Sequence, residues 1–470
     1  MNWKSFEFGL NMQKTGSTRI TQSGKPQLSK NARQTDPDRN WRRFVLFRVL
    51  FNSRFYYPVL AVFFIDLGLS VTQYTVLNFA WALAIVFTDV PAGALADRIG
   101  RKPLIVAATC CMVAETLLLI LAPQNGGITL FILCLMNRIL SGVAEGTASG
   151  ADEALVFDSL AEQGRSSDWP LVLDQVTRWQ GVGMVIAMLV GGAVYDSAFM
   201  NRIFGPFGLS VTQSMTMRFP VYLNLVLALL ALWVVLGLRE PVVRQTHVAP
   251  VEGEQPETAA SAVALVLSAG KWIARSPVAL FVILGGLSLD SIIRLFLTLS
   301  SSYFRLISLP EVTYGLFGAI IGLLGLVVSP VARWMVANQS LAKNYFLLAL
   351  ITLAALIGLT FRWPLWGVLF ILPVSAAIIA VGFMASYYLN ALAGSNQRAT
   401  VLSFKGLAFN IGYGFVSLLF AILLQAFRDG ARPEAALAQG LLLLPPWLVF
   451  TSITLLVAFW KYRRKLCRTY

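Results

Sequence analysis

The chain has 470 residues, of which 57% are apolar and 13% are charged, and its formal net charge is +14. Soluble globular proteins carry about 45–50% apolar and about 25% charged residues. A single core cannot hide this excess of apolar residues, because cores stop growing at about 250–300 residues. The composition therefore indicates a protein surrounded by lipid bilayer. It excludes a soluble enzyme, a secreted scaffold and a nucleic-acid-binding domain.

Apolar segments long enough to cross a bilayer recur along the whole chain. A membrane-spanning helix needs about 20 mostly apolar residues. We predict an all-α integral membrane protein with twelve transmembrane helices, at residues 44–65, 74–96, 104–122, 128–148, 171–195, 219–238, 278–299, 314–336, 345–361, 365–390, 400–427 and 437–460.

The basic residues are distributed unevenly between the segments that join these spans. Residues 1–43 contain nine basic residues and no apolar core of signal-peptide length, so we interpret them as a disordered cytoplasmic tail. With this tail inside, the inner segments carry 25 of the 37 Lys and Arg residues, and the outer segments carry six. Basic residues collect on the cytoplasmic side. We therefore predict a multi-pass protein of the cytoplasmic (inner) membrane with both termini inside, ending in a basic tail at 461–470.

A polar stretch at residues 239–276 divides the chain into two sets of six spans, residues 44–238 and 277–460. Its first part is typical of a flexible linker, and its second part favours an amphipathic helix on the inner leaflet. The two sets look related at an offset of 240, which aligns Arg54 with Arg294 and the segment Leu-Ser-Val-Thr-Gln-Tyr at 69–74 with Leu-Pro-Glu-Val-Thr-Tyr at 309–314. Repeated halves of this kind build transporters whose substrate site lies between them.

The segment between the second and third spans carries a specific motif, Gly-Ala-Leu-Ala-Asp-Arg-Ile-Gly-Arg-Lys at 93–102. It resembles the signature loop of the major facilitator superfamily, Gly-x-x-x-Asp-Arg-x-Gly-Arg-Lys, at every specified position. The resemblance implies two pseudo-symmetric six-helix bundles (the major facilitator fold) and a transporter rather than an enzyme, without a cofactor and expected to be monomeric.

In this family the loop helps to latch the two halves, and Arg101 would need a carboxylate partner from the acidic stretch after the fourth span. The alternative is a solvated helix end with scattered charges. The latch residues implied by the resemblance are Gly93, Asp97, Arg98, Gly100, Arg101, Glu153 and Asp158, with Asp152 as a further candidate partner of Arg101.

The fifth span carries glycines at a spacing that permits close helix contact. Gly183, Gly191 and Gly192 resemble the glycine-proline motif of the family's drug/proton antiporters, although Ala187 and Met188 replace a Gly and the Pro. Simple packing of the helix against its neighbours is the alternative interpretation.

Charged residues within spans are costly, so they usually face a cavity or a partner. The resemblance implies that spans one, four, seven and ten line a central cavity. It makes Arg54, Asn52, Tyr57, Arg138, Arg294, Tyr387, Tyr388 and Asn390 the substrate-binding candidates. Arg54 and Arg294 could clamp an anion from both halves, since guanidinium groups match carboxylate and phosphate. The alternative is that the arginines form structural pairs with Glu115, Glu145 and Asp290, the same three acids that are our proton-coupling candidates.

These features predict a secondary active transporter that moves a small solute, with an anionic solute favoured, by alternating access. No Walker motif occurs, so ATP does not drive the transport. We expect a proton rather than sodium as the coupling ion, because buried carboxylates are available and no sodium site is recognisable in the sequence. The alternatives are proton-coupled efflux of amphiphilic or cationic drugs, and a non-transporting receptor or scaffold with a transporter fold. The one histidine, His247, and the four cysteines show no metal-ligand spacing, so we predict no metal site and no catalytic site.

Overall fold

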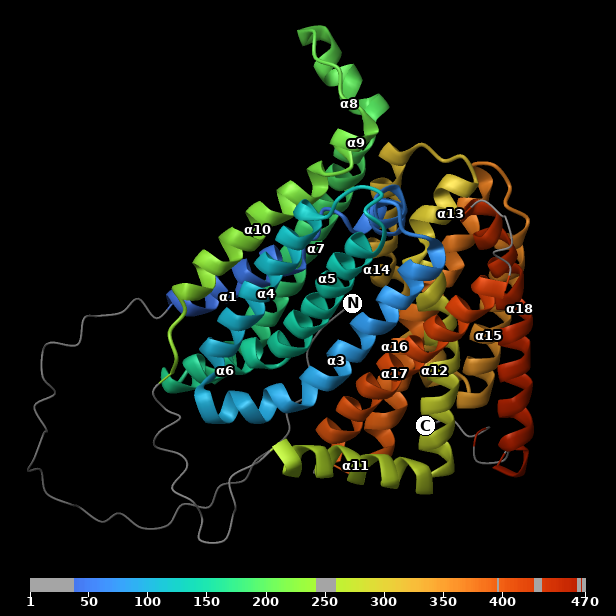
Figure 1. Cartoon of the computed structure of the whole chain (residues 1–470). Helices are drawn as coiled ribbons and strands as arrows, with labels where there is room; N and C mark the ends of the chain where they lie inside the picture. Colours follow the sequence, from blue (N-terminus) through green and yellow to red (C-terminus); the bar gives the residue numbers. More distant parts are fainter. Residues whose placement is uncertain (1–37, 242–258, 395–396, 427–432, 463–465, 467–470) are drawn as a thin grey trace, which may run out of the picture. The chain divides into compact units, whose positions relative to one another are not determined.

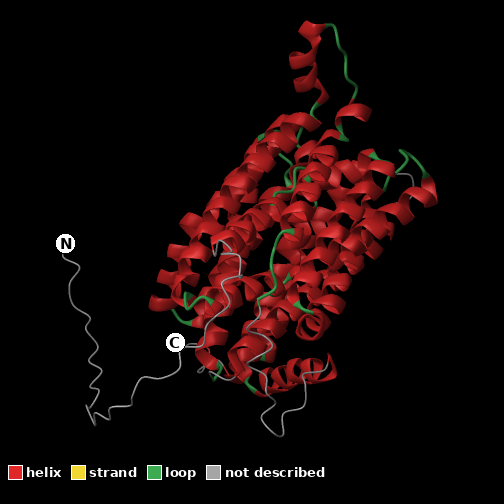
Figure 2. Ribbon diagram, turned by 90° about the vertical axis from the view of Figure 1, so that its left-hand side faces the viewer, coloured by secondary structure: helices red, strands yellow, loops and turns green. Residues whose placement is uncertain are grey.

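The computed structural model describes residues 38–241, 259–394, 397–426, 433–462 and 466. No strand occurs in these ranges, and the ribbon consists of helices joined by loops (Figures 1 and 2). Among the described residues, ten helices are long and apolar enough to cross a membrane, and a pair of helices bent by 81° is an eleventh candidate. Most of the predicted tails at 1–43 and 461–470, and the linker residues 242–258, lie outside the described residues.

These eleven candidates coincide with the second to twelfth predicted spans, and two shorter helices, α1 and α2, cover the first. The first half contains α1 (Asp38–Asn52) with α2 (Leu60–Asp66), α3 (Val71–Ile99), α4 (Arg101–Leu121), α5 (Gly127–Ala148), α7 (Trp169–Tyr195) and α10 (Phe219–Leu236). The second half contains α12 (Pro277–Thr298), α14 (Tyr314–Asn338), α15 (Leu341–Thr360), α16 (Ile371–Leu392), α17 (Arg398–Ala426) and α18 (Pro433–Ala458). Shorter helices join them, at α6 (Ala151–Glu162), α8 (Ser197–Phe204), α9 (Gln213–Thr216), α11 (Ala259–Arg275) and α13 (Ser300–Leu306), with 3-10 turns at η1 (Tyr57–Val59) and η5 (Glu311–Thr313).

The passes run between two ends, which we name after a short helix at each. The α8 end contains α2, α8 and α13, and the α11 end contains α6, α11 and the turn from α3 to α4 (Figure 1). Gly100 forms that turn with a φ of +102°, a backbone conformation that favours glycine. At the opposite end of α3, Ser70 and Gln73 form a capping box that starts the helix.

The first pass is broken, whereas the sequence predicted one continuous span over 44–65. The helix stops at Asn52 and resumes through η1 and α2, and Pro58, which lacks a backbone N–H, lies in the first turn of the resumed segment. The pass also begins at Asp38, inside the predicted tail. Asn40 fixes this early start by donating hydrogen bonds to the Ser159 hydroxyl (2.8 Å) and the Arg239 carbonyl (3.1 Å).

The two halves contact each other along α3 with α17 and along α7 with α14, and α11 packs against both α3 and α17. One contact marks the relation between the halves. The N–H groups of Ala61 and Val62 donate to the Ser301 hydroxyl at 3.0 and 3.2 Å, and Ala61 and Ser301 are 240 residues apart. The two halves also align in sequence at an offset of 240 residues. Ala61 therefore contacts its equivalent residue in the other half, and two equivalent residues touch only beside the pseudo-two-fold axis that relates the halves.

Candidate functional site

A cavity of about 420 Å³ lies between the two halves. Ligand sites for small molecules span about 300–1,000 Å³, so its size suits such a ligand. The first half contributes Tyr57, Pro58, Leu60, Trp81, Arg138, Glu145, Met184 and Met188 to the lining. The second half contributes Arg294, Leu297, Thr298, Ser300, Ser301, Phe304, Tyr314, Gly318, Ile321, Gly322 and Tyr413. The lining is apolar and aromatic, with two arginines and one carboxylate.

The two arginines come from opposite halves and lie against aromatic rings. The Cζ atom of Arg138, on α5, is 5.3 Å from the centroid of the Trp81 ring, and that of Arg294, on α12, is 5.4 Å from the Tyr413 ring. The rings of Trp81 and Tyr413 meet edge to face, with centroids 6.3 Å apart. Each guanidinium therefore makes a cation–π contact. We call these four side chains the arginine–aromatic bridge.

The two arginines differ in how their charge is balanced. Arg294 forms an ion pair with Asp290 at 2.7 Å and donates to the Asn410 side chain at 2.8 Å. Arg138 has no ion pair within the described residues, and its hydrogen bond to the Asn78 side chain is long, at 3.4 Å. Its side chain is only 6% exposed, and its buried Nε atom has no hydrogen-bond partner. Arg138 therefore lacks the acidic partner that a buried guanidinium requires.

Glu145 lies on the same helix as Arg138, two turns nearer the α11 end. Its side chain is exposed to the cavity, and the described residues offer its carboxylate no hydrogen bond or ion pair. The charges of Arg54, Arg138 and Arg294 all act on it, and the charge of Glu115 opposes them. Of the three predicted proton-coupling acids, Glu145 alone lines the cavity, since Asp290 pairs with Arg294 and Glu115 is buried elsewhere.

Arg54 does not line the cavity, although the sequence paired it with Arg294. Arg54 is 4% exposed and forms a buried ion pair with Glu115 on α4, while its Nε donates to the Phe51 carbonyl at 3.1 Å. The counter-ion on α4 neutralises this arginine outside the cavity. Arg138, rather than Arg54, is the first-half arginine that reaches Arg294 through the arginine–aromatic bridge.

The remaining substrate-binding candidates also divide between the cavity and other places. Tyr57 lines the cavity. Asn52 donates to the Arg48 carbonyl of its own helix at 2.9 Å. The hydroxyl of Tyr388 is buried and accepts from the Asn344 side chain at 2.7 Å. Tyr387, Tyr388 and Asn390 all lie on α16, which contributes no residue to the cavity lining.

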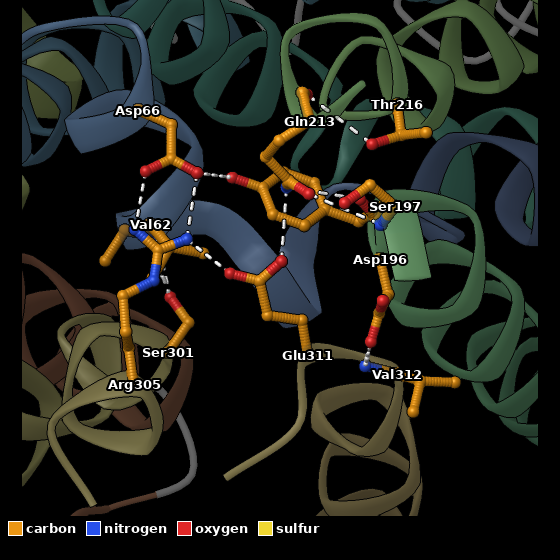
Figure 3. A network of polar contacts seen from close by, with 12 residues as sticks. Val62, Asp66, Asp196, Ser197, Gln213, Thr216, Ser301, Arg305, Glu311 and Val312 are labelled. Carbon is orange, nitrogen blue, oxygen red and sulfur yellow. Dashed lines mark hydrogen bonds and ion pairs between the residues drawn. The ribbon is translucent and has the colours of Figure 1, made fainter. Parts of the chain in front are cut away.

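A polar network closes the α8 end, and the sequence reasoning missed it (Figure 3). Arg305 on α13 makes a bidentate contact with Asp66 of α2, at 2.5 and 2.8 Å, and also contacts Glu311. The hydroxyl of Tyr195 donates to the same Asp66 carboxylate at 2.5 Å. Gln213 donates to Glu311 at 3.1 Å. Since Asp66, Tyr195 and Gln213 belong to the first half and the other two to the second, the network joins the halves.

This arrangement keeps the guanidinium group of Arg305 positively charged. Burial alone would lower the pKa of its guanidinium, but the hydrogen bonds to Asp66 and the negative charges of Asp66 and Glu311 outweigh burial and raise that pKa. Arg305 therefore stays positively charged, and the network persists as an ionic contact as long as its carboxylates are ionised.

Close helix packing reinforces the network at the same end. Asp196 accepts from the N–H of Val312 at 2.9 Å, across the two halves. A Cβ atom on Gly192 of α7 would lie 2.7 Å from the backbone nitrogen of Gly315 on α14, so the two helices touch through glycines. The glycines of the fifth span thus serve packing in this structure. Towards the α11 end, large apolar side chains of both helices, such as Trp179 and Leu326, are exposed instead.

The predicted latch residues lie at the α11 end. Arg101 pairs with Asp158 of α6 at 2.5 Å. Glu153 contacts Arg48, which also pairs with Asp152 at 3.1 Å. Gly93 and Arg98 are exposed, and Gly100 forms the turn described above; the side chain of Asp97 lies outside the described residues.

A carboxylate that the sequence reasoning missed supports this turn. Glu240 accepts from the N–H groups of Arg101 and Lys102, at 2.8 and 2.7 Å. These N–H groups open α4, where a negative charge stabilises the helix. The contact holds the segment that follows α10 against the α3–α4 turn.

Two related sets of membrane-crossing helices enclose a cavity that is closed at one end, and this architecture defines a membrane transporter rather than an enzyme. The sequence profile described as Major Facilitator Superfamily matches residues 44–417, and the chain belongs to that family. No curated protein matches the sequence.

Solved structures share the fold at low sequence identity. The nucleoside transporter NupG superimposes with a TM-score of 0.67 at 14% identity, covering 90% of this chain and 98% of that chain. A bacterial homolog to the human lysosomal transporter Spinster, inward-facing and unoccupied, gives a TM-score of 0.66 at 15% identity, covering 93% and 100%. A D-xylose-proton symporter gives a TM-score of 0.59 at 14% identity, covering 89% and 97%. The likeness extends to the whole fold and leaves the substrate open.

Proposed function

We propose that this protein is a proton-coupled secondary transporter for a small solute that carries an anionic group. The observation that carries the proposal is Arg138, a buried guanidinium in the central cavity without an acidic partner. A charge of this kind is costly inside a membrane protein unless it is balanced. A carboxylate or phosphate group of the solute would supply the missing acceptor, and Arg294 from the other half would approach the same ligand.

The proposed coupling group is Glu145. Its carboxylate faces the cavity without a fixed partner, and it lies within the electrostatic influence of both cavity arginines. An anionic solute bound at Arg138 would lower the local positive potential and so favour the protonated form of Glu145. Solute and proton would then cross together, which is the charge balance that a symporter requires.

We further propose that the structure represents the inward-facing state, with the α11 end in the cytoplasm. The distribution of basic residues supports this orientation, and the polar network at the α8 end supports closure towards the outside. Opening to the outside would break the contacts of Arg305 with Asp66 and Glu311. It would also separate α7 from α14 at their glycine contact, while the cavity closes at the α11 end.

Substrate binding provides the first test. Purified protein is screened by thermal shift against small carboxylates, phosphate esters and lipophilic cations, and the affinity of the hit is measured by calorimetry. We expect an anion to bind and Arg138→Ala to weaken it about 10–100-fold, because a hydrogen bond to a charged group contributes about 1.5–3 kcal/mol. The matched control is Arg178→Ala, which removes an exposed guanidinium paired with Asp174 on the same half. Equal affinities for the two variants would contradict the proposal.

Flux in proteoliposomes tests the role of Glu145. Glu145→Gln cannot exchange a proton, so we expect gradient-driven uptake to be lost while solute exchange between the two sides persists. Asp174→Asn, which changes an exposed acid in the same way, serves as the control and should leave both activities intact. If the Gln variant still accumulates solute against its gradient, the proton is carried elsewhere.

Efflux of amphiphilic cations is the second candidate function, and the lining of the cavity favours it. Methionine and aromatic side chains, among them Met184, Met188 and Phe304, suit a flexible apolar ligand. Glu145 would then accept the positive charge of the ligand. In the same screen, this function would be favoured by a lipophilic cation that competes with protonation of Glu145 and whose affinity is unchanged by Arg138→Ala. Absence of any flux would favour a receptor or scaffold.

A further inference from the structure

A second cavity, of about 330 Å³, lies away from the substrate cavity and within the second half of the protein. Residues of α12, α15 and α18 line it, and nearly all of them are apolar. Phe281 packs edge to face against Tyr345 and Phe459, with ring centroids 5.6 and 5.4 Å apart. We call this cavity the lateral crevice.

The lateral crevice opens to the outer surface of the helix bundle. Three of its lining residues, Phe346, Leu456 and Trp460, are 62%, 54% and 64% exposed. The helices α15 and α18 contribute nothing to the substrate cavity. In a membrane, the crevice therefore faces lipid.

Two lysines flank the crevice at the α11 end. Lys343 follows the lining residue Ala342 in the first turn of α15, and Lys461 follows the lining residue Trp460 just after α18. Both side chains are exposed, and that of Lys343 has no ion pair within the described residues. Positive charge thus lies beside the end of an apolar channel.

Acidic residues are scarce in this part of the sequence. Between Glu311 and the end of the chain, the only acidic residues are Asp429 and Glu434. Glu434 lies in the first turn of α18, at the opposite end of that helix from Trp460, and Asp429 precedes it in the chain. Glu434 is therefore too distant to neutralise the two lysines.

We propose that the lateral crevice binds a phospholipid with an anionic head group, one acyl chain lying among α12, α15 and α18 and the phosphate lying between Lys343 and Lys461. Bulk lipid tails are as apolar as the crevice, so the acyl chain alone gives no selectivity. Selectivity comes from the lysines, because basic pockets between membrane helices attract anionic head groups. The site is independent of which solute crosses the substrate cavity.

Native mass spectrometry of the delipidated protein tests the proposal with two lipids of identical chains, phosphatidylglycerol and phosphatidylcholine. We expect phosphatidylglycerol to bind at least tenfold more tightly. The double variant Lys343→Gln with Lys461→Gln should lose about 25-fold in affinity for phosphatidylglycerol, since each lysine contributes about fivefold. The matched control, Lys271→Gln with Arg275→Gln on α11, removes the same charge from exposed positions at the same end of the molecule. Equal affinity for both lipids, or an equal loss in the control, would overturn the proposal.

A photoreactive phosphatidylglycerol with a diazirine on its acyl chain tests the position of the chain. In the native protein we expect crosslinks to peptides of α12, α15 and α18. Ala349→Phe fills the crevice from α15 and should abolish these crosslinks. Crosslinks that persist in this variant, with an unchanged melting temperature, would place the lipid elsewhere. The lysine variant remains informative even if Ala349→Phe fails to fold, because its substitutions are on the surface.

Discussion

Removing the guanidinium of Arg305 should shift the protein towards a state that is open at the α8 end, which is the outward-open state in the orientation proposed above. The side chain makes a bidentate contact with Asp66 of the other half and a further contact with Glu311, which Gln213 of the other half also holds. The contact between the halves exists only while the α8 end is closed. Arg305→Ala therefore destabilises the closed state and leaves the open state, in which Arg305 is solvated, nearly unchanged.

The size of the shift follows from the burial of the pair. Breaking a fully buried ion pair costs about 3–5 kcal/mol, whereas an exposed pair contributes about 0.2–1 kcal/mol. Here the side chain of Arg305 is 30% exposed and that of Asp66 is 17% exposed. We therefore expect about 2 kcal/mol, which corresponds to a change of about 30-fold in the ratio of open to closed protein.

Cysteine accessibility measures this ratio. The four native cysteines are replaced by alanine, and the substitution Leu297→Cys places a single thiol in the lining of the substrate cavity. A membrane-impermeant thiol reagent is then added to intact cells. It reaches the introduced thiol only when the α8 end opens, so the labelling rate reports the open fraction. We expect the rate to rise about 30-fold in Arg305→Ala, and to rise less in Arg305→Lys, which keeps the charge but loses the bidentate contact.

The control is Arg202→Ala, because Arg202 is an exposed arginine on α8 at the same end of the molecule. It should label at the rate of the unmodified background. Equal rates for Arg305→Ala and Arg202→Ala would show that the polar network does not hold the α8 end closed, and the inference of an ionic gate would be refuted.

Three further predictions concern packing and pairing. Glu115→Ala leaves Arg54 buried without its counter-ion, so the free energy of unfolding should fall by about 3–5 kcal/mol; a double change to leucine at both positions should recover most of this loss in thermal melts, and a stable single variant would contradict the buried pair. Gly315→Val places a Cβ atom 2.0 Å from the Met188 carbonyl oxygen and should raise labelling of the Leu297→Cys thiol, whereas Gly325→Val, with nothing within 4 Å, should not. Asp158→Asn breaks the pair with Arg101 and should change the transport rate while solute affinity stays constant; Asp168→Asn, which breaks a pair within one short segment, is the comparison, and equal rates would remove Asp158 from the latch.

The sequence predicts the fold well because each span is a local property of the chain. Mean hydropathy over a short window identifies a helix regardless of its neighbours, and the motif at 93–102 identifies the family, which the profile match over residues 44–417 confirms. The break in the first pass also has a local signal, Pro58, which the prediction of one continuous span over 44–65 did not take into account. Local signals thus account for the helices and their order.

The candidate site depends on contacts between distant segments, which no local pattern reveals. Arg54 and Glu115 are 61 residues apart, and their pairing depends on how the first pass packs beside α4. The arginine–aromatic bridge likewise joins α3 to α17. The sequence did contain a signal for the polar network. The repeat offset of 240 aligns α2 with α13, and these two segments carry Asp66 and Arg305, which have opposite charges.

The contact between Ala61 and Ser301 has a consequence for the history of the molecule. If the halves descend from one duplicated segment, the ancestral chain presented identical side chains to each other at this axis. The counterpart of Asp66 is Leu306, and that of Arg305 is Ile65, so neither charge has a copy in the other half. The ionic contact at the α8 end is therefore single rather than doubled, and the two surfaces that form it are no longer copies of each other.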